Sequence, residues 1–231
     1  GKAVLVEKAF TVTLAGTEEV VAAATKAGVF AMEAMWTRFL PAVEAAREVV
    51  AWGRIGQVLG VQGDLCAFRP YDPTNRLWDP ATGGGAVLDL GVYVVSMAQG
   101  LLGAARDVHC VGRYAPNGVE SAATMNISYV GGGTAALTCG FDVHGPGRMT
   151  IFGTKGWVEI QPRFHHPTTI SVHRSGVLPR IIEAKQIGRG YAHELMEVSD
   201  CLLAGQTQSA TMPLADTVEV MRVLESCLKQ L

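Results

Sequence analysis

The chain has 231 residues, of which 48% are hydrophobic and only 17% are charged. Its 19 Lys and Arg residues nearly balance its 21 Asp and Glu residues, so the formal net charge is −2. Nucleic acids and anionic membranes are bound by strongly basic surfaces, so this balance argues against both as partners. The charged fraction lies below the roughly 25% of an average globular domain. We therefore expect a folded chain with a sizeable core.

The cysteines and the hydropathy of the sequence indicate the cellular compartment of the protein. The sequence has five cysteines, an odd number with no CxxC spacing. They are Cys66, Cys110, Cys139, Cys201 and Cys227. Such spacing is typical of reduced core thiols. No apolar run approaches the ~18 residues of a membrane helix, and the start shows no signal-peptide pattern. We expect a cytoplasmic protein with no membrane contact.

The first 36 residues predict a strand, a helix and a second strand. Residues 3–6 are continuously apolar, as in a buried parallel strand. Residues 17–19 (Thr-Glu-Glu) are typical of a helix start, which predicts a helix over residues 20–27 ending at Gly28. Residues 29–36 form a second apolar run. This βαβ order belongs to a parallel sheet and is too small to stand alone.

The remainder predicts a meander of strands flanked by helices. A helix begins at Pro41 and runs to residue 50, and another covers residues 86–102. Two further helices, over residues 192–203 and 214–231, close the chain. The predicted strands are residues 57–68, 108–114, 122–129, 134–143, 149–152, 156–160 and 169–173. This pattern predicts an α+β fold with helices on one face of a mainly antiparallel sheet.

Two of these strands suggest self-association. Small or apolar residues occupy both alternating sets, as in Ala122, Ala123 and Met125 or in Ala135 and Leu137. Helices would cover only one face of such a sheet, which leaves the other for a second subunit. We expect a homodimer or homotetramer formed through the open sheet.

Polar residues follow the first two predicted strands. Glu7 and Lys8 follow the first, and Trp36 and Arg38 follow the second. In open α/β sheets the carboxyl ends of strands face the ligand crevice. Lys8 there either contacts substrate or cofactor or is simply solvated. Trp36 and Arg38 either form a wall and a polar anchor for substrate or are an interface aromatic and a surface arginine.

A third candidate lies on the helix after the glycines at 83–85. Asp89 and Tyr93 are four residues apart, so they share one helical face. Tyr93 is suited to pass a proton if a nearby ammonium lowers its pKa, and Asp89 is suited to accept substrate hydroxyls. The alternative is a buried tyrosine with an aspartate favoured by the helix dipole.

The histidines do not predict a metal site. His165 and His166 are adjacent between two prolines, and adjacent residues in a strand point opposite ways. A metal site needs three or four converging ligands. His193 and Glu194 lack the second histidine of HExxH.

In combination, these segments resemble the Gfo/Idh/MocA family of oxidoreductases. The resemblance is carried by residues 1–8, 33–39, 83–93, 190–194 and 213–217, so it spans the whole chain. Each segment is short, and the ordered combination is the specific signal. Trp36 and Arg38 look most like the dihydrodiol dehydrogenase and sugar-oxidising branch.

The resemblance implies a Rossmann domain that holds NAD or NADP, followed by an open-faced substrate domain. By resemblance, Lys8 would contact substrate and nicotinamide with Glu7 beside it, Asp89 would bind or orient substrate, and Tyr93 would be the acid/base. Ala9 departs from the family, which usually has a proline after the lysine, commonly in a cis peptide.

The glycine-rich fingerprint of that Rossmann domain does not occur in these residues. No strand is followed by GxGxxG, and no acidic residue lies ~20 positions beyond one. A complete cofactor domain would need roughly 90 to 120 further residues upstream. We therefore interpret residues 1–36 as the last βαβ piece of a Rossmann domain and residues 37–231 as a substrate-binding and oligomerisation domain.

The predicted function of the parent protein is NAD(P)-dependent hydride transfer between nicotinamide and a carbinol carbon of a sugar, polyol or diol. The rival hypothesis is a catalytically silent substrate-domain protein that acts as a binding or dimerisation module. The pyrophosphate of a dinucleotide is held at a glycine-rich helix N-terminus. The 231-residue chain alone is therefore expected neither to bind the cofactor tightly nor to turn over.

Overall fold

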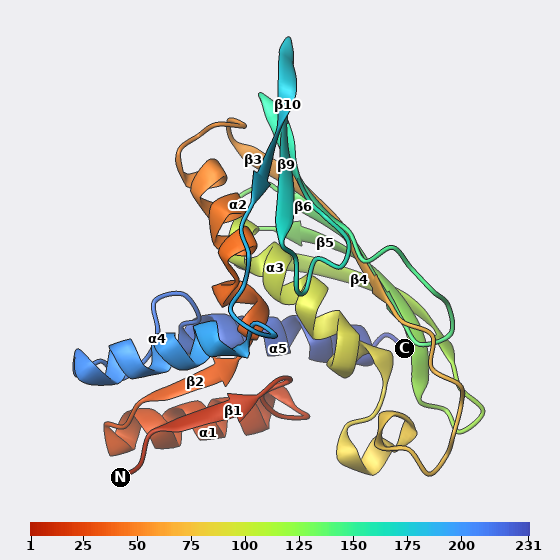
Figure 1. The fold of residues 1–231 in the computed structure, drawn as a ribbon. Helices are drawn as coiled ribbons and strands as arrows, with labels where there is room; N and C mark the ends of the chain where they lie inside the picture. The colour runs from red at the N-terminus through yellow and green to blue at the C-terminus, as the bar shows by residue number, and fades with distance from the viewer.

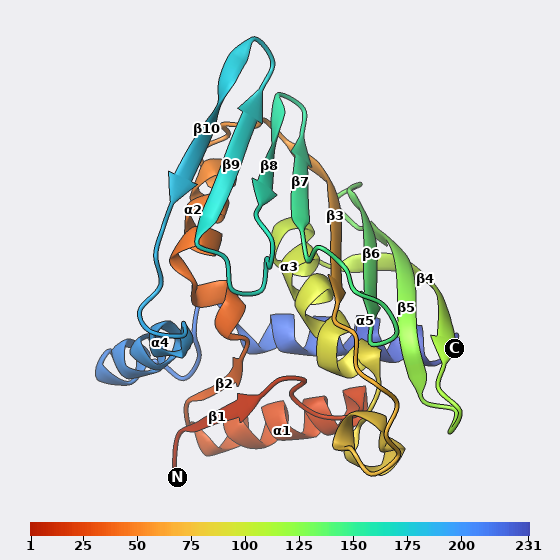
Figure 2. The same cartoon turned by 45° about the vertical axis from the view of Figure 1, so that its right-hand side comes forward.

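The computed structural model describes residues 1–231, which form two separate sheets (Figure 1). The smaller sheet pairs β1 (Val4–Glu7) in parallel with β2 (Ala31–Ala34), and α1 (Leu14–Ala27) connects them. Helix α1 lies on one side of this sheet and α4 (Tyr191–Leu203) on the other in both views (Figures 1 and 2). The predicted βαβ unit is thus present, with a helix from the far end of the chain above it.

The first helix begins earlier than predicted. Thr13 is its N-cap, because the Thr13 hydroxyl accepts a hydrogen bond from the backbone N–H of Gly16 at 3.1 Å. The expected cap at residues 17–19 is therefore wrong, and Thr17 is fully buried inside the helix. The end is as predicted, with Gly28 in the left-handed conformation at φ 61°.

The larger sheet has eight strands in the order β10-β9-β8-β7-β3-β6-β5-β4. Its strands are β3 (Val58–Cys66), β4 (Ala105–Tyr114), β5 (Glu120–Tyr129), β6 (Thr134–Gly140), β7 (Met149–Gly153), β8 (Gly156–Ile160), β9 (Thr169–Arg174) and β10 (Val177–Glu183). Every neighbouring pair is antiparallel except β3 and β6. The α+β prediction is confirmed, although β10 was not anticipated.

Helices cover one face of this sheet (Figure 2). The helices are α2 (Pro41–Ala51) over β8 and β9, α3 (Val92–Leu102) over β3 and β6, and α5 (Leu214–Leu228) over β4. Buried side chains such as Met125, Leu137 and Ile151 point from the sheet into this layer. Burial of that face explains the apolar strand positions.

The opposite face is more polar than predicted. Thr124, Asn126 and Thr134 are exposed, whereas their neighbours Met125 and Ala135 are buried. The outer set of β5 and β6 combines small residues such as Ala136 with polar ones, and the cover of this face by a second subunit stays a prediction. Successive side chains in a strand alternate between faces, so only the inner set needs to be apolar.

The segment Pro80–Leu102 contradicts the expectation that no apolar stretch approaches the length of a membrane helix. Its most apolar window has a mean hydropathy of 1.5, enough by length and composition to cross a membrane. In the fold, 72% of that window is buried, as in a core helix. Within the segment, Val87–Gly91 forms a π-helical turn directly before α3, and this turn carries Asp89. Such turns are frequent at functional sites.

Candidate active site

Lys8 and Asp89 form the centre of the site. Lys8 follows β1, and its ammonium donates hydrogen bonds to the Asp89 carboxylate at 3.0 Å and to the Asp89 main-chain oxygen at 2.7 Å. The same ammonium lies 4.8 Å from the centroid of the Tyr93 ring. The fold therefore joins residues that are more than 80 positions apart in the sequence, and the three residues to which the family resemblance assigned the chemistry lie together.

Tyr93 lies in the first turn of α3 and is buried. Its hydroxyl oxygen accepts a hydrogen bond from the indole N–H of Trp36 at 3.1 Å. Burial raises the pKa of Tyr93 above its ordinary value, and the Trp36 hydrogen bond opposes that rise. The sequence analysis made proton transfer by Tyr93 conditional on an ammonium that lowers this pKa. Lys8 lies at the ring face, but burial has the larger effect and the pKa is raised.

Trp36 is the centre of an aromatic wall. Its indole stacks with the ring of Tyr191 at 4.6 Å and with His166 at 6.2 Å between centroids, at interplanar angles of 29° and 20°. Gly190 permits this approach, because a Cβ there would lie 2.9 Å from the Trp36 ring. Stacked rings of this kind suit the apolar face of a sugar or a flat diol.

His165 lies in the site, although the sequence analysis considered it only as a possible metal ligand. Its ring lies 5.6 Å from the Tyr93 ring and 6.3 Å from Trp36, and Thr37 donates a hydrogen bond to its main-chain oxygen at 2.8 Å. Burial lowers the pKa of His165 to about 3, so its imidazole is neutral near pH 7. Its buried Nδ1 has no hydrogen-bond partner. The only sequence signal was the His-His pair between prolines.

Arg38 does not point into this cluster, contrary to expectation. Residues Trp36–Phe39 form a 3-10 turn, and Arg38 is only 4% exposed. It donates hydrogen bonds to Ser96 at 2.9 Å and to Gln99 at 2.7 Å, and it forms an ion pair with Asp216. Arg38 therefore ties the start of α2 to α3 and α5.

A buried acid supports the loop that carries Lys8. Glu33 on β2 is 2% exposed, and its carboxylate accepts a hydrogen bond from the backbone N–H of Phe10 at 3.2 Å. Burial raises the pKa of Glu33 to about 7, although Thr217, Arg38 and Lys8 act in the opposite direction. The peptide bond between Lys8 and Ala9 is cis. A lone acid in an apolar strand gave no sequence signal for this role.

A second buried acid lies near Glu7. Glu194 in the first turn of α4 is 5% exposed, and burial together with the Glu7 charge raises its pKa to about 7. Glu7 itself is exposed at the end of β1. Within residues 1–231, no group of three or more His, Cys, Asp or Glu side chains is arranged to hold a metal ion.

The arrangement combines an ammonium, a carboxylate and a phenol in one place. A phenol beside an ammonium is able to exchange a proton with a substrate hydroxyl, and the ammonium stabilises negative charge that develops on that oxygen. The carboxylate is able to accept a second hydroxyl. This chemistry suits proton transfer at a carbinol.

The chain is similar in sequence to named dehydrogenases. Residues 43–159 match the profile of the GFO/IDH/MocA C-terminal domain. Trans-1,2-dihydrobenzene-1,2-diol dehydrogenase from Mus musculus is 34% identical over 241 residues, which cover 99% of this chain and 70% of the mouse protein. The Homo sapiens protein of the same name is 33% identical over 236 residues, with the same two coverages.

Solved structures share the fold. Aldose-aldose oxidoreductase from Caulobacter crescentus, in complex with glycerol, superposes with a TM-score of 0.87 at 27% identity over 99% of this chain and 69% of that one. A levoglucosan dehydrogenase in complex with NADH and levoglucosan gives a TM-score of 0.87 at 20% identity over 99% and 71%. The chain therefore belongs to the Gfo/Idh/MocA family of oxidoreductases.

Proposed function

We propose that the protein transfers hydride between a nicotinamide cofactor, NAD or NADP, and a carbinol carbon of a sugar, polyol or diol. The observation that carries this proposal is the convergence of Lys8, Asp89 and Tyr93, with Trp36 bonded to the Tyr93 hydroxyl. Its relatives are named dehydrogenases of a diol, and a similar solved structure is an aldose-aldose oxidoreductase.

Tyr93 is the proposed acid/base at its hydroxyl oxygen. The Trp36 N–H occupies one acceptor position of that oxygen, so the phenol proton has to point elsewhere, toward a bound carbinol. Burial favours the neutral phenol. In the reduction direction, this phenol gives its proton to the carbinol oxygen. In the oxidation direction, Tyr93 takes the carbinol proton after losing its own to solvent, a step that the nearby positive charge of Lys8 favours.

Lys8 and Asp89 orient the substrate in this proposal. Two N–H groups of Lys8 are used by Asp89, and a third is left to donate to the reacting oxygen. The Asp89 carboxylate keeps acceptor capacity for a neighbouring hydroxyl. Trp36 and Tyr191 form the wall against the carbon skeleton.

The residues fit the nicotinamide end of a cofactor. Glu7 and Lys8 lie at the carboxyl end of β1, and Glu7 is exposed there. Bound nicotinamide supplies the hydride acceptor or donor. The 231 residues contain no glycine-rich turn for the pyrophosphate, so the grip on the rest of the dinucleotide is assigned to other residues.

We further propose a homodimer or a dimer of dimers formed through the open face of the eight-stranded sheet. Large exposed side chains, among them Val111, Phe152 and Trp157, support this assignment. Light scattering on wild type and on Trp157→Glu tests it. A monomeric mass for the wild type across the micromolar range contradicts it.

The proposed activity is tested on the chain joined at its N-terminus to a complete cofactor-binding domain. NAD or NADP is incubated with aldoses or a trans-dihydrodiol, and formation of reduced nicotinamide is followed by absorbance. Turnover that falls 100-fold or more in Tyr93→Phe supports the proposal. Sugar binding with no cofactor reduction favours the rival, a silent binding module.

A further inference from the structure

Resting on the proposed function, we propose that the substrate of this site is an anionic polyol, a sugar or diol that carries a carboxylate or phosphate. Its charged group is held by three arginines, Arg69, Arg76 and Arg163, which we call the cationic rim. The reacting carbinol lies at Tyr93 and Lys8, and the charged group takes no part in bond changes.

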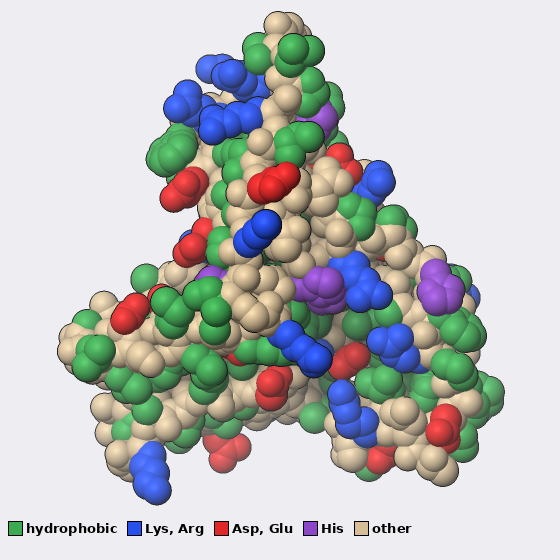
Figure 3. All heavy atoms as spheres, viewed as in Figure 1, with side chains coloured by type: hydrophobic (Ala, Val, Ile, Leu, Met, Phe, Trp, Pro, Cys, Tyr) green, Lys and Arg blue, Asp and Glu red, His purple; other side chains and the backbone are tan.

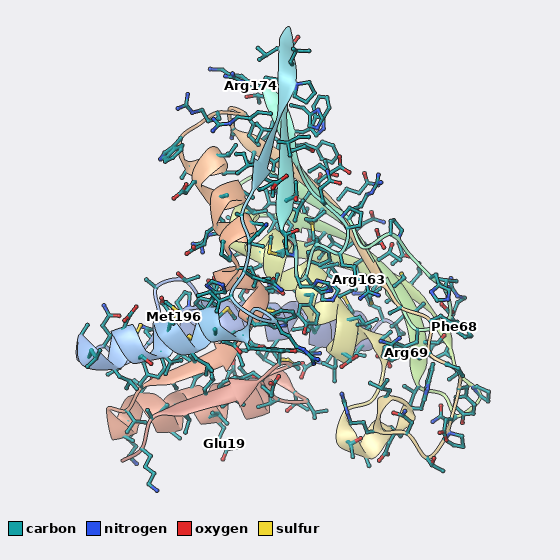
Figure 4. The ribbon with its side chains drawn as sticks, viewed as in Figure 1. Glu19, Phe68, Arg69, Arg163, Arg174 and Met196 are labelled. Carbon is teal, nitrogen blue, oxygen red and sulfur yellow. The ribbon has the colours of Figure 1, made fainter.

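Sheet topology brings two of these arginines to the same edge. Strand β7 is antiparallel to both β3 and β8, so β3 and β8 run in the same direction and end at the same edge. Arg69 lies three residues beyond the end of β3, and Arg163 lies three residues beyond the end of β8. Figure 4 labels Arg69 and Arg163 on the side of the eight-stranded sheet that faces the smaller sheet of β1 and β2.

The rim adjoins the catalytic cluster. Arg163 is two residues from His165, whose ring packs against Tyr93 and Trp36. The charge of Arg163 is close enough to act with burial in lowering the pKa of that histidine. Arg76 reaches the cluster directly, since its guanidinium lies 3.9 Å from the Asp89 carboxylate. Figure 3 shows Lys and Arg side chains gathered beside histidines in the middle of this face.

The positive charges here exceed the carboxylates that contact them. Asp89 is the only carboxylate within 4.0 Å of Lys8 or Arg76, and Arg69 and Arg163 have none. By contrast, Arg148 at the same sheet edge is paired with Glu159 at 3.5 Å. One carboxylate is therefore shared by two cations, and two more guanidiniums lack a counter-charge.

The ligand chemistry follows from the guanidinium group. Arginine offers a planar fork of N–H donors that matches carboxylate and phosphate oxygens in a bidentate way. The cofactor pyrophosphate is a poor match, because Rossmann proteins hold it at a glycine-rich helix N-terminus. The rim residues follow strands of the eight-stranded sheet or lie in the loop after β3. We therefore assign the cationic rim to the charged group of the substrate.

The test uses three matched sugars and the chain joined at its N-terminus to a complete cofactor-binding domain. Glucose, glucuronate and glucose 6-phosphate share the same anomeric carbinol and differ only at the far carbon, which is neutral, a carboxylate or a phosphate ester. kcat/KM is measured for each with NAD and NADP, at low and high salt. The variants are Arg163→Gln and, as a matched control, Arg174→Gln. Arg174 ends β9 far from the site and forms no ion pair (Figure 4).

We expect at least one anionic sugar to exceed glucose in kcat/KM by about tenfold or more, the effect of one charge-assisted hydrogen bond. High salt should shrink this preference. Arg163→Gln should lower it roughly tenfold, whereas Arg174→Gln should leave it intact. If glucuronate has the raised kcat/KM, the anion is a carboxylate, and if glucose 6-phosphate has it, the anion is a phosphate.

The failures are distinguishable. Equal or greater kcat/KM for glucose, or an anion preference that survives Arg163→Gln, overturns the inference and leaves the proposed function standing. If no sugar is turned over, calorimetric titration of the same three sugars decides. Binding of the anionic sugars alone then keeps the anion site and rejects the dehydrogenase, and no such binding overturns the inference as well.

Discussion

Replacement of Glu33 by glutamine should make the stability of the chain less sensitive to pH. Glu33 is 2% exposed, and its pKa is raised from the ordinary value of 4.5 to about 7, chiefly by burial. Glutamine keeps an oxygen that accepts from the Phe10 N–H. Its amide N–H₂ is able to donate to the buried Thr217 hydroxyl, which already acts on the Glu33 carboxyl in the wild type. Glu33→Gln therefore removes the titration with little change in shape.

The magnitude follows from proton linkage. Between pH 4.5 and 7 the folded chain keeps the Glu33 proton while the unfolded chain releases it, so wild-type stability falls as pH rises through this window. At ~1.4 kcal/mol per pKa unit, the gap between the two pKa values amounts to about 3 kcal/mol. The loss is absent below pH 4.5 and complete above pH 7. The titration of His165 has the opposite direction, but it is present in both proteins and cancels in their difference.

The assay is urea unfolding of the 231-residue chain, as wild type and as Glu33→Gln, at several pH values from about 4.5 to 8. The free energy of unfolding of the variant, minus that of the wild type, should rise by about 3 kcal/mol over this range and then level off. A difference that stays flat, or that falls with pH, would show that Glu33 does not hold a proton in the fold.

Three further predictions concern the site and its supports. Trp36→Phe keeps the aromatic wall but removes the hydrogen bond to Tyr93, so kcat should fall roughly 2- to 10-fold with little change in KM; an unchanged kcat would mean that the indole does not orient the phenol. Arg38→Met leaves Asp216 without its buried partner and should lower the free energy of unfolding by about 3 kcal/mol, measured in urea, whereas a loss well below 1 kcal/mol would contradict a structural role. Calorimetric titration of NAD(H) or NADP(H) into the 231-residue chain should give no micromolar binding, and a micromolar dissociation constant would mean that these residues grip the cofactor themselves.

Local signals in the sequence predicted most elements of the fold. Pro41 at a helix start and Gly28 at a helix end have fixed conformational preferences, so α2 and the end of α1 were predicted correctly. The predicted start of α1 was wrong because Gly16, a poor helix former, lies in the first turn of the helix. The residues from Thr13 to Gly16 therefore looked like part of a loop. Strand β10 was missed because it is exposed almost throughout and contains Pro179, so it shows no alternating pattern.

The candidate site was predicted in part. Sequence spacing joined only Asp89 to Tyr93. Lys8 and Trp36 were placed at the ligand crevice by their positions after the first two predicted strands, and the resemblance then gave Lys8 its role. His165 could not be found, because a loop has no periodicity and its contact with Trp36 arises only in the folded chain. Arg38 was misplaced because a 3-10 turn, rather than a strand end, sets the direction of its side chain.

Transfer of deuterium to the cofactor is the most direct test of the central claim, that Lys8, Asp89 and Tyr93 form a dehydrogenase site. Glucose or glucuronate deuterated at the anomeric carbon is incubated with NAD or NADP and the chain joined at its N-terminus to a complete cofactor-binding domain. The reduced cofactor is then examined by mass spectrometry. The account predicts deuterium in the reduced nicotinamide, at a rate that falls at least roughly 100-fold in Tyr93→Phe. Transfer at an undiminished rate in that variant would contradict the account.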